Sequence, residues 1–108
     1  MGGTHPTAGE LRDVVYDIVS NIPYGRVLTY GAIAFLAGYP NHSRLVGRIM
    51  REAPDMELPC HRVVSSTGRL APHFPTQADL LAKEGVRLSP SGKVPLRKYI
   101  WHLDDPVA

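Results

Sequence analysis

Apolar residues in the first third of the chain recur every three or four positions, as they do on one face of a helix. They are Leu11, Val14, Val15, Ile18, Val19 and Ile22. Thr7 stands before this run with Glu10 three residues later, a pair that is typical of a helix N-terminus. The segment Pro23-Tyr24-Gly25 breaks the pattern. The spacing therefore predicts an amphipathic helix that begins near Thr7 and ends before Pro23.

Three shorter helices are predicted further along the chain. They cover about residues 30–37, a segment from Asn41 or Ser43 to about Arg51, and about residues 76–83. Thr29 is the expected N-cap of the first of these, and Asn41 or Ser43 that of the second. Gly85 is expected to close the last helix, because glycine readily adopts the left-handed conformation that follows a helix end.

The remaining patterns predict a small amount of β structure. Residues 62–65 and 69–70 flank a Ser-Thr-Gly turn and predict a short hairpin. The segment 93–101 alternates loosely and carries Tyr99 and Trp101, so we expect it to pack back on the body. The predicted fold is mainly α with a small β wing, that is, a winged helix-turn-helix DNA-binding domain.

Length and composition fit one small globular domain. A chain of 108 residues has room for a single core, and 44% of its residues are hydrophobic. We expect a domain at 7–103 between short tails at 1–6 and 104–108. No apolar run is long enough to cross a bilayer, and no leader is apparent, so we expect a reducing cytoplasmic or nuclear location. A net charge of +2 does not by itself indicate nucleic-acid binding.

The single cysteine lies in the string Pro59-Cys60-His61-Arg62-Val63. A lone cysteine is either a buried structural thiol or a nucleophile. Pro59 restricts the backbone before it, while His61 and Arg62 supply positive charge that favours the thiolate. The flanking residues therefore favour the nucleophile. The histidines show no metal-ligand spacing with Cys60, and we expect neither a metal nor a cofactor.

Three arginines share one face of the helix that ends near Arg51. Arg44, Arg48 and Arg51 are spaced four and three residues apart. They form either a solvated cationic stripe or, on the second helix of a helix-turn-helix, a surface that faces duplex DNA. Gly47 is unfavourable inside a helix, so it is expected to permit a close approach by a packed neighbour or by a nucleic-acid backbone.

Four strings, in this order, resemble the O6-alkylguanine-DNA alkyltransferase family. They are Ile22–Val27 with Thr29-Tyr30-Gly31, Ala37–Pro40 with Ser43–Gly47, Pro59–Val63, and Leu80–Val86. The resemblance covers about residues 11–101. It implies a helix-turn-helix that docks in the minor groove and a protein that acts on alkylated guanine.

The resemblance also implies roles for individual residues. Cys60 is the alkyl acceptor, His61 activates it through a water molecule, and Glu84 holds His61. Tyr30 crowds a phosphate to rotate the damaged nucleotide outward, and Arg44 fills the gap. Taken alone, Glu84 could be a solvent-facing charge, Tyr30 an ordinary amphipathic side chain and Arg44 a phosphate contact.

The lesion pocket is expected to involve Pro59, Arg62, Val63 and Arg69. Arg48, Arg51 and Gly47 complete the expected DNA surface.

The chain departs from the family pattern in several places. The printed sequence holds no counterpart of the N-terminal domain of full alkyltransferases, so we expect the short alkyltransferase-like type, yet Cys60 is present where those proteins usually carry tryptophan. Ala53 stands where full alkyltransferases carry an asparagine that organises the active-site turn. The segment Arg69–Pro75 is shorter than their pocket loop and lacks its glycines. The C-terminal stretch from Gly92 to Trp101 looks more like that of the short proteins.

We therefore expect a monomeric DNA-repair protein that binds O6-alkylguanine in double-stranded DNA and flips the base. The first interpretation is irreversible alkyl transfer to Cys60, as in a single-turnover cysteine S-methyltransferase. The alternative is a non-catalytic lesion sensor that recruits nucleotide excision repair. A winged-helix transcription regulator is a third possibility, but it gives no reason for the Pro-Cys-His-Arg string.

Overall fold

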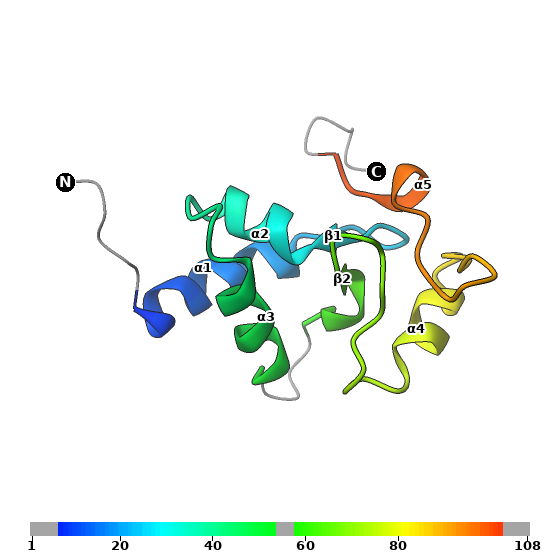
Figure 1. The fold of residues 1–108 in the computed structure, drawn as a ribbon, viewed down its shortest axis with the longest axis horizontal. Coiled ribbons are helices and arrows are strands. Elements are labelled where there is room, and N and C mark those ends of the chain that lie inside the picture. The colour runs from blue at the N-terminus through cyan, green and yellow to red at the C-terminus, as the bar shows by residue number, and fades with distance from the viewer. Residues whose placement is uncertain (1–6, 54–57, 103–108) are drawn as a thin grey trace.

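A computed structural model describes residues 7–53 and 58–102. Its elements are α1 (Ala8–Ser20), β1 (Leu28–Thr29), α2 (Tyr30–Leu36), α3 (Ser43–Arg51), the 3-10 turn η1 (Cys60–Arg62), β2 (Val63–Val64), α4 (Gln77–Lys83) and α5 (Leu96–Tyr99). Figure 1 shows α1, α2 and α3 gathered at one end, the two short strands in the middle, and α4 and α5 at the other end. The fold is mainly helical with a small sheet, as predicted.

The three-helix end forms because its helices present apolar faces to one another. Leu11, Val15, Val19 and Ile33 have exposed fractions of 1% or less and pack with Val46 of α3. The predicted caps at Thr7 and Thr29 are confirmed, since each hydroxyl oxygen accepts a hydrogen bond from the N–H three residues on, at 3.1 and 3.0 Å. These two hydroxyls satisfy backbone donors that the first helical turn leaves free.

Two details of this end differ from expectation. Val14 is 42% exposed, because it lies at the margin of the apolar face of α1. The N-cap of α3 is His42, not Asn41 or Ser43, and its side chain makes no capping hydrogen bond. The apolar pattern located both helices correctly, but it missed the margin of the α1 face and the N-cap of α3.

The strand pairing is the main correction. β2 pairs with β1 in parallel, with Leu28 opposite Val63 and Thr29 opposite Val64. The predicted hairpin between 62–65 and 69–70 does not form as a ladder: Ser65 N–H donates to Arg69 O at 3.0 Å and closes a turn, and Arg69 forms its bridge with Lys93. β2 is instead paired along its length with β1, whose two residues are both buried.

The sheet divides the core in two because side chains of a strand alternate between its faces. Leu28 and Val63 join the three-helix cluster. Val27 and Val64 join a second cluster with Leu81, Val86, Val94 and Tyr99. The prediction that 93–101 packs back is confirmed: Trp101 N–H donates to Val27 O at 2.9 Å, and Tyr99 is buried. The helix α5 within this segment was not predicted.

The predicted tails at 1–6 and 104–108 lie outside the described residues, and their boundaries stay predictions. Within 7–53 and 58–102, no helix has the length and apolar character that a membrane span requires.

Candidate functional site

The cysteine opens the short turn η1 between the two cores. Pro59 precedes the turn with φ of −78°, and Arg62 N–H donates to Pro59 O at 2.9 Å. Cys60 N–H donates to Leu58 O at 2.8 Å. Cys60 is partly buried and packs against the three-helix core. The backbone of the turn is thus fixed on both sides of the thiol.

Glu84, at the C-cap of α4, holds this turn from the opposite side. Its carboxylate lies 2.6 Å from His61 Nε2 and accepts from Arg62 at 2.7 Å through Nη2. It also accepts from the backbone N–H of Gly25 at 2.8 Å. The Glu84 side chain is only 6% exposed. A buried carboxylate with three donors around it acts as the anchor of the site.

The titration of Glu84 reflects these contacts. Burial by itself raises the pKa of the carboxyl group, but hydrogen bonds from Arg62, Gly25 and His61 outweigh it and bring the pKa down from 4.5 to about 2. Glu84 is therefore ionised at neutral pH, and it favours a proton on His61 Nε2. His61 Nδ1 is the ring nitrogen that does not contact Glu84.

Arg62 connects η1 to the segment after α1. Its Nη1 donates to Ile22 O at 2.8 Å, and its guanidinium lies 5.7 Å from the ring centre of Tyr24. Tyr24 in turn donates through its hydroxyl to Lys83 O at 2.7 Å. Gly25, with φ of +79°, brings its backbone close to Glu84. The segment Pro23-Tyr24-Gly25 was predicted only to end the helix. In the structure its Gly25 N–H also donates a hydrogen bond to the Glu84 carboxylate.

Cys60 and His61 border a cavity of about 460 Å³. Arg51 and Ala53 line one side of it, and His73 and Phe74 line another. This volume lies within the range of small-molecule sites, about 300–1,000 Å³. Ala53, which stands where the family has asparagine, contributes no side-chain amide to the wall.

The structure does not place the four residues expected in the lesion pocket on this cavity. Arg62 is turned onto Glu84, and Val63 is buried in β2. Arg69 is exposed beside Lys93, and Pro59 caps η1. None of these four residues lines the cavity in the part of the chain that the structure describes. Their part in lesion recognition stays a prediction.

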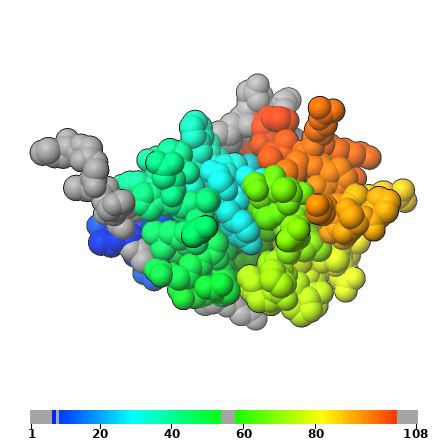
Figure 2. All heavy atoms as spheres, in the orientation of Figure 1, coloured from blue at the N-terminus to red at the C-terminus, as the bar shows by residue number. Residues whose placement is uncertain are grey.

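A second hollow, of about 300 Å³, brings together three of the residues expected to contact DNA. Tyr30, Arg44 and Gly47 line it with Ser65 and Ser66. A Cβ atom added to Gly47 would meet nothing within 4 Å, so this glycine is not there to admit a packed neighbour. Figure 2 shows α3 (green) and the yellow-green segment after β2 on the same face of the molecule.

The arginine stripe runs along the exposed side of α3. Arg44, Arg48 and Arg51 are all exposed, with Arg44 at the second hollow and Arg51 at the Cys60 cavity. Tyr30 lines the second hollow and lies near Cys60: burial raises the pKa of its hydroxyl, and the electrostatic effect of Cys60 raises that pKa further. One helix therefore links a cationic surface to the cysteine.

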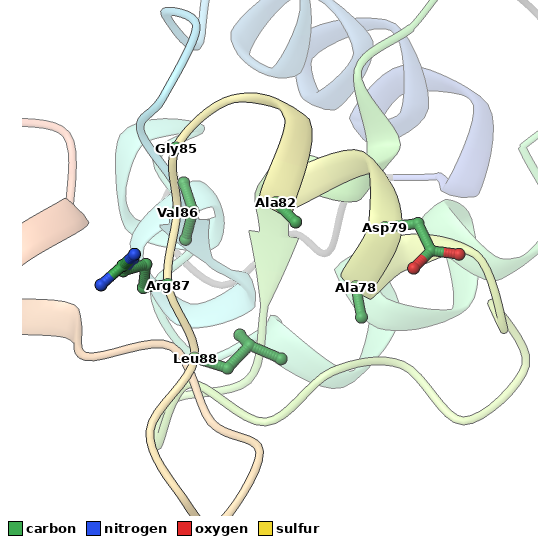
Figure 3. Close-up of a pocket in the computed structure, with 7 residues that line it drawn as sticks. All are labelled: Ala78, Asp79, Ala82, Gly85, Val86, Arg87 and Leu88. Atoms are coloured by element: carbon green, nitrogen blue, oxygen red, sulfur yellow. The ribbon is translucent and has the colours of Figure 1, made fainter.

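A third hollow lies beside α4 and is lined by Ala78, Asp79, Ala82 and residues 85–88 (Figure 3). Its two charged residues, Asp79 and Arg87, point to opposite sides in Figure 3. No charged groups converge on it, and none of the predicted site residues lines it. In residues 7–53 and 58–102, no three histidine, cysteine or acidic side chains are placed to hold a metal ion.

Sequence reasoning missed Gln77, a fully buried residue whose side-chain amide donates to the His61 carbonyl in η1. A signal was present, since Gln77 precedes Leu81 by four residues and so shares the apolar face of α4.

The chain is similar to known proteins over most of its length. Residues 10–86 match the family model described as 6-O-methylguanine DNA methyltransferase, DNA binding domain. The chain is 41% identical over 92 residues to the DNA base-flipping protein of Escherichia coli (strain K12), and this match covers 82% of this chain and 71% of that protein. It is 38% identical over 85 residues to the human methylated-DNA–protein-cysteine methyltransferase, covering 75% of this chain and 41% of the human protein.

A third relative is similar in both sequence and structure. Alkyltransferase-like protein 1 of Schizosaccharomyces pombe is 38% identical over 97 residues, covering 81% of this chain and 90% of that protein. Its crystal structure in complex with damaged DNA containing O6-carboxymethylguanine superposes with a TM-score of 0.79, covering 87% of this chain and 96% of that one. The chain belongs to the 6-O-methylguanine DNA methyltransferase DNA-binding domain family.

Proposed function

We propose that this protein binds O6-alkylguanine in duplex DNA and rotates the damaged nucleotide out of the stack into the Cys60 cavity. The observation that carries the proposal is the arrangement around α3. The hollow of Tyr30, Arg44 and Gly47 lies toward the N-terminal part of this helix, and the Cys60 cavity lies at its C-terminal end, where Arg51 lines it. Two relatives support it by name, one as a base-flipping protein and one as a protein crystallised on alkylated DNA.

The proposed binding step uses charge and shape separately. Arg48 and its neighbours on α3 attract the phosphates, so affinity for any duplex falls as salt rises. Arg44 enters the gap that the rotated nucleotide leaves, while Tyr30 presses on the adjacent phosphate. Gly47 allows the DNA backbone to approach α3, because nothing but open space lies over its Cα atom.

As a lesion sensor, the protein would leave the alkyl group in place and pass the damaged site to other proteins. Nucleotide excision repair is the candidate recipient that the family resemblance suggests. The short relatives from E. coli and S. pombe, most of whose length this chain covers, favour this form of the proposal over alkyl transfer.

Alkyl transfer is a second candidate because Cys60 and His61 line one cavity and Glu84 hydrogen-bonds to His61. In this reaction His61 Nδ1 takes the proton of the Cys60 thiol through a water molecule. The sulfur then attacks the alkyl carbon, the bond from that carbon to O6 breaks, and guanine leaves as an anion that takes a proton. The product is a thioether on Cys60. The Glu84–His61 hydrogen bond of 2.6 Å supports this chemistry, whereas Ala53 supplies no amide to the turn.

The binding proposal is tested by titrating two labelled duplexes that differ only in O6-methylguanine or guanine at one position, at one fixed salt concentration. We expect the protein to bind the alkylated duplex at least about tenfold more tightly, that is by about 1.4 kcal/mol. Equal affinities would overturn the proposal.

The two candidates are separated by the intact mass of the protein after incubation with the alkylated duplex. A sensor keeps its mass, whereas an alkyltransferase gains one methyl group per molecule. The matched control is Cys60→Ala, which should keep the binding preference and never gain mass.

A further inference from the structure

Gln77 makes an unusual set of contacts for a side chain with an exposed fraction of 0%. Its Nε2 donates to Val63 O at 2.9 Å and to His61 O at 3.1 Å. Its Oε1 accepts from the backbone N–H of Ala71 at 2.8 Å. One amide therefore joins the active-site turn, β2 and the segment 71–76, which contributes cavity-lining residues.

The segment that Gln77 holds has little other regular structure. Phe74 N–H donates to Ala71 O, and Gln77 N–H donates to Phe74 O, both at 3.1 Å. With the bond from Ala71 N–H to the Gln77 side chain, these form a closed ring of three hydrogen bonds. Only the side-chain bond ties the beginning of the segment to its end.

This segment forms part of the wall of the Cys60 cavity. His73, Phe74 and Thr76 line the cavity, and His61 lines it as well. Gln77 touches both parts of the wall, through Ala71 on the loop and through the carbonyl of His61 on the turn. A shift of the amide would therefore change the distance between Phe74 and the cysteine.

We propose that Gln77 is a positioning residue for lesion recognition, which fixes the 71–76 wall against the active-site turn before DNA is bound. The inference rests on the proposed function and deepens it. A wall that is already in place loses less conformational freedom when the flipped base enters, so more of the contact energy appears as affinity.

The proposed role of Gln77 requires both the Nε2 donor and the Oε1 acceptor of its side-chain amide. A methionine at this position has similar length but leaves two carbonyls and one N–H without their partner, and a buried polar group without a partner is costly. A glutamate keeps the acceptor for Ala71 but places a carboxylate against two carbonyl oxygens. Neither change touches the exposed surface of α3.

The binding test compares wild type, Gln77→Met and Leu81→Val on duplexes with O6-methylguanine or guanine. Leu81 lies one turn further along the same helix face and is equally buried, and its apolar side chain cannot hydrogen-bond to Ala71, so Leu81→Val controls for loss of stability. All three are measured well below their unfolding temperatures. For Gln77→Met we expect the affinity for the alkylated duplex to fall about tenfold. The affinity for the undamaged duplex should stay within about twofold, and Leu81→Val should change neither by more than that.

A second readout needs no DNA. Hydrogen exchange at the Ala71 amide should be slow in wild type and in Leu81→Val, and it should become fast in Gln77→Met. The amide of Leu80, which is bonded within α4 to Thr76 O, reports whether the helix itself survives. A purely global loss of stability would accelerate both amides, whereas release of the loop accelerates Ala71 alone.

The outcomes separate the two proposals. If wild type prefers the alkylated duplex and Gln77→Met keeps that preference, the inference is wrong and the proposed function stands. If the Ala71 amide exchanges rapidly in wild type, the loop is not held and the inference is again wrong. If wild type shows no preference at all, the proposed function fails, and with it the recognition role of Gln77, even where Ala71 exchange shows the loop to be held.

Discussion

The two ends of the molecule use their polar side chains in opposite ways. At the three-helix end, the core is apolar, and the residues with a proposed role on DNA, Arg44 and Arg48, are exposed. At the other end, Glu84 and Gln77 are buried, and each holds several parts of the chain together. Removing a polar group should therefore have different consequences at the two ends.

The difference shows where stability and recognition can be separated. An exposed arginine contributes little to folding, so its loss should affect DNA binding alone. A buried carboxylate that pairs with Arg62 supports the fold and the site at once, and its loss should affect both. The predictions below test this contrast, from the largest expected effect to the smallest.

Glu84→Ala should give the largest loss of stability. It leaves Arg62 and His61 without the carboxylate that both contact in a site where Glu84 is 6% exposed. We expect the free energy of unfolding to fall by about 3 kcal/mol, as measured by urea denaturation. Asp13→Ala removes an exposed carboxylate from α1 as a control and should change it by less than about 0.5 kcal/mol. Similar losses of unfolding free energy in Glu84→Ala and Asp13→Ala would contradict the contrast between buried and exposed polar groups.

The same carboxylate predicts a dependence of stability on pH. Its pKa is about 2 in the folded protein against an ordinary 4.5, so it stabilises the fold fully above pH 4.5. This contribution, at most about 3 kcal/mol, is lost as the pH falls from 4.5 toward 2. Glu84→Gln should lose less stability than wild type over that window in parallel denaturation series. Parallel curves for the two proteins would contradict the proposed anchoring role.

Arg44→Ala should affect recognition without affecting the fold. If Arg44 fills the gap left by the rotated nucleotide, the preference for alkylated over undamaged duplex should fall about tenfold, while the unfolding temperature stays the same. Arg48→Ala is the matched control, since a phosphate contact should weaken both duplexes equally and reduce the salt dependence. An equal weakening of both duplexes by Arg44→Ala would make Arg44 a phosphate contact as well.

Gly47→Ala should raise the stability of the free protein and lower its affinity for DNA. The added Cβ meets no atom within 4 Å, and alanine favours helix over glycine by about 1 kcal/mol, so the free protein should become more stable. The same Cβ projects into the space proposed for the DNA backbone, so affinity for both duplexes should fall. Increased stability together with unchanged affinity would place the DNA elsewhere.

The smallest effect concerns the size of the alkyl group. The 69–75 segment carries Pro72 and Pro75 and no glycine, so a wall that does not close tightly should accept bulky adducts. We expect affinities of Cys60→Ala for O6-benzyl- and O6-methylguanine duplexes to differ by less than about tenfold. A stronger rejection of the benzyl adduct would show that the segment closes over the base.

Sequence reasoning performed best where the determinants are local. The helices α1 to α4, the caps at Thr7 and Thr29 and the arginine stripe of α3 follow from local signals, chiefly spacings of three and four residues. The pairing of β1 with β2 joins Leu28 to Val63 and could not be read from two short apolar runs. The turn signal after β2 suggested a hairpin, but β1 offered a partner in the centre of the core.

The site was predicted in part. Resemblance pointed to Cys60, His61 and Glu84, and the structure brings the last two within hydrogen-bond distance. The contacts of Glu84 with Gly25 and Arg62 span 59 and 22 residues, and no pattern along the chain predicts them. Arg62 was expected at the lesion pocket, whereas its guanidinium faces Glu84 because that carboxylate is the buried charge beside it.

The central claim, that the damaged base enters the cavity at Cys60, is tested most directly by disulfide trapping. Cys60 is the only cysteine of the chain, so every cross-link reports on this position. Duplexes carrying a thiol tether on the C6 position of one guanine, or on a base two positions away, are incubated with the protein in a redox buffer. We predict rapid cross-linking to the guanine tether and little to the displaced one. Equal cross-linking to both, or none to either, would contradict the claim.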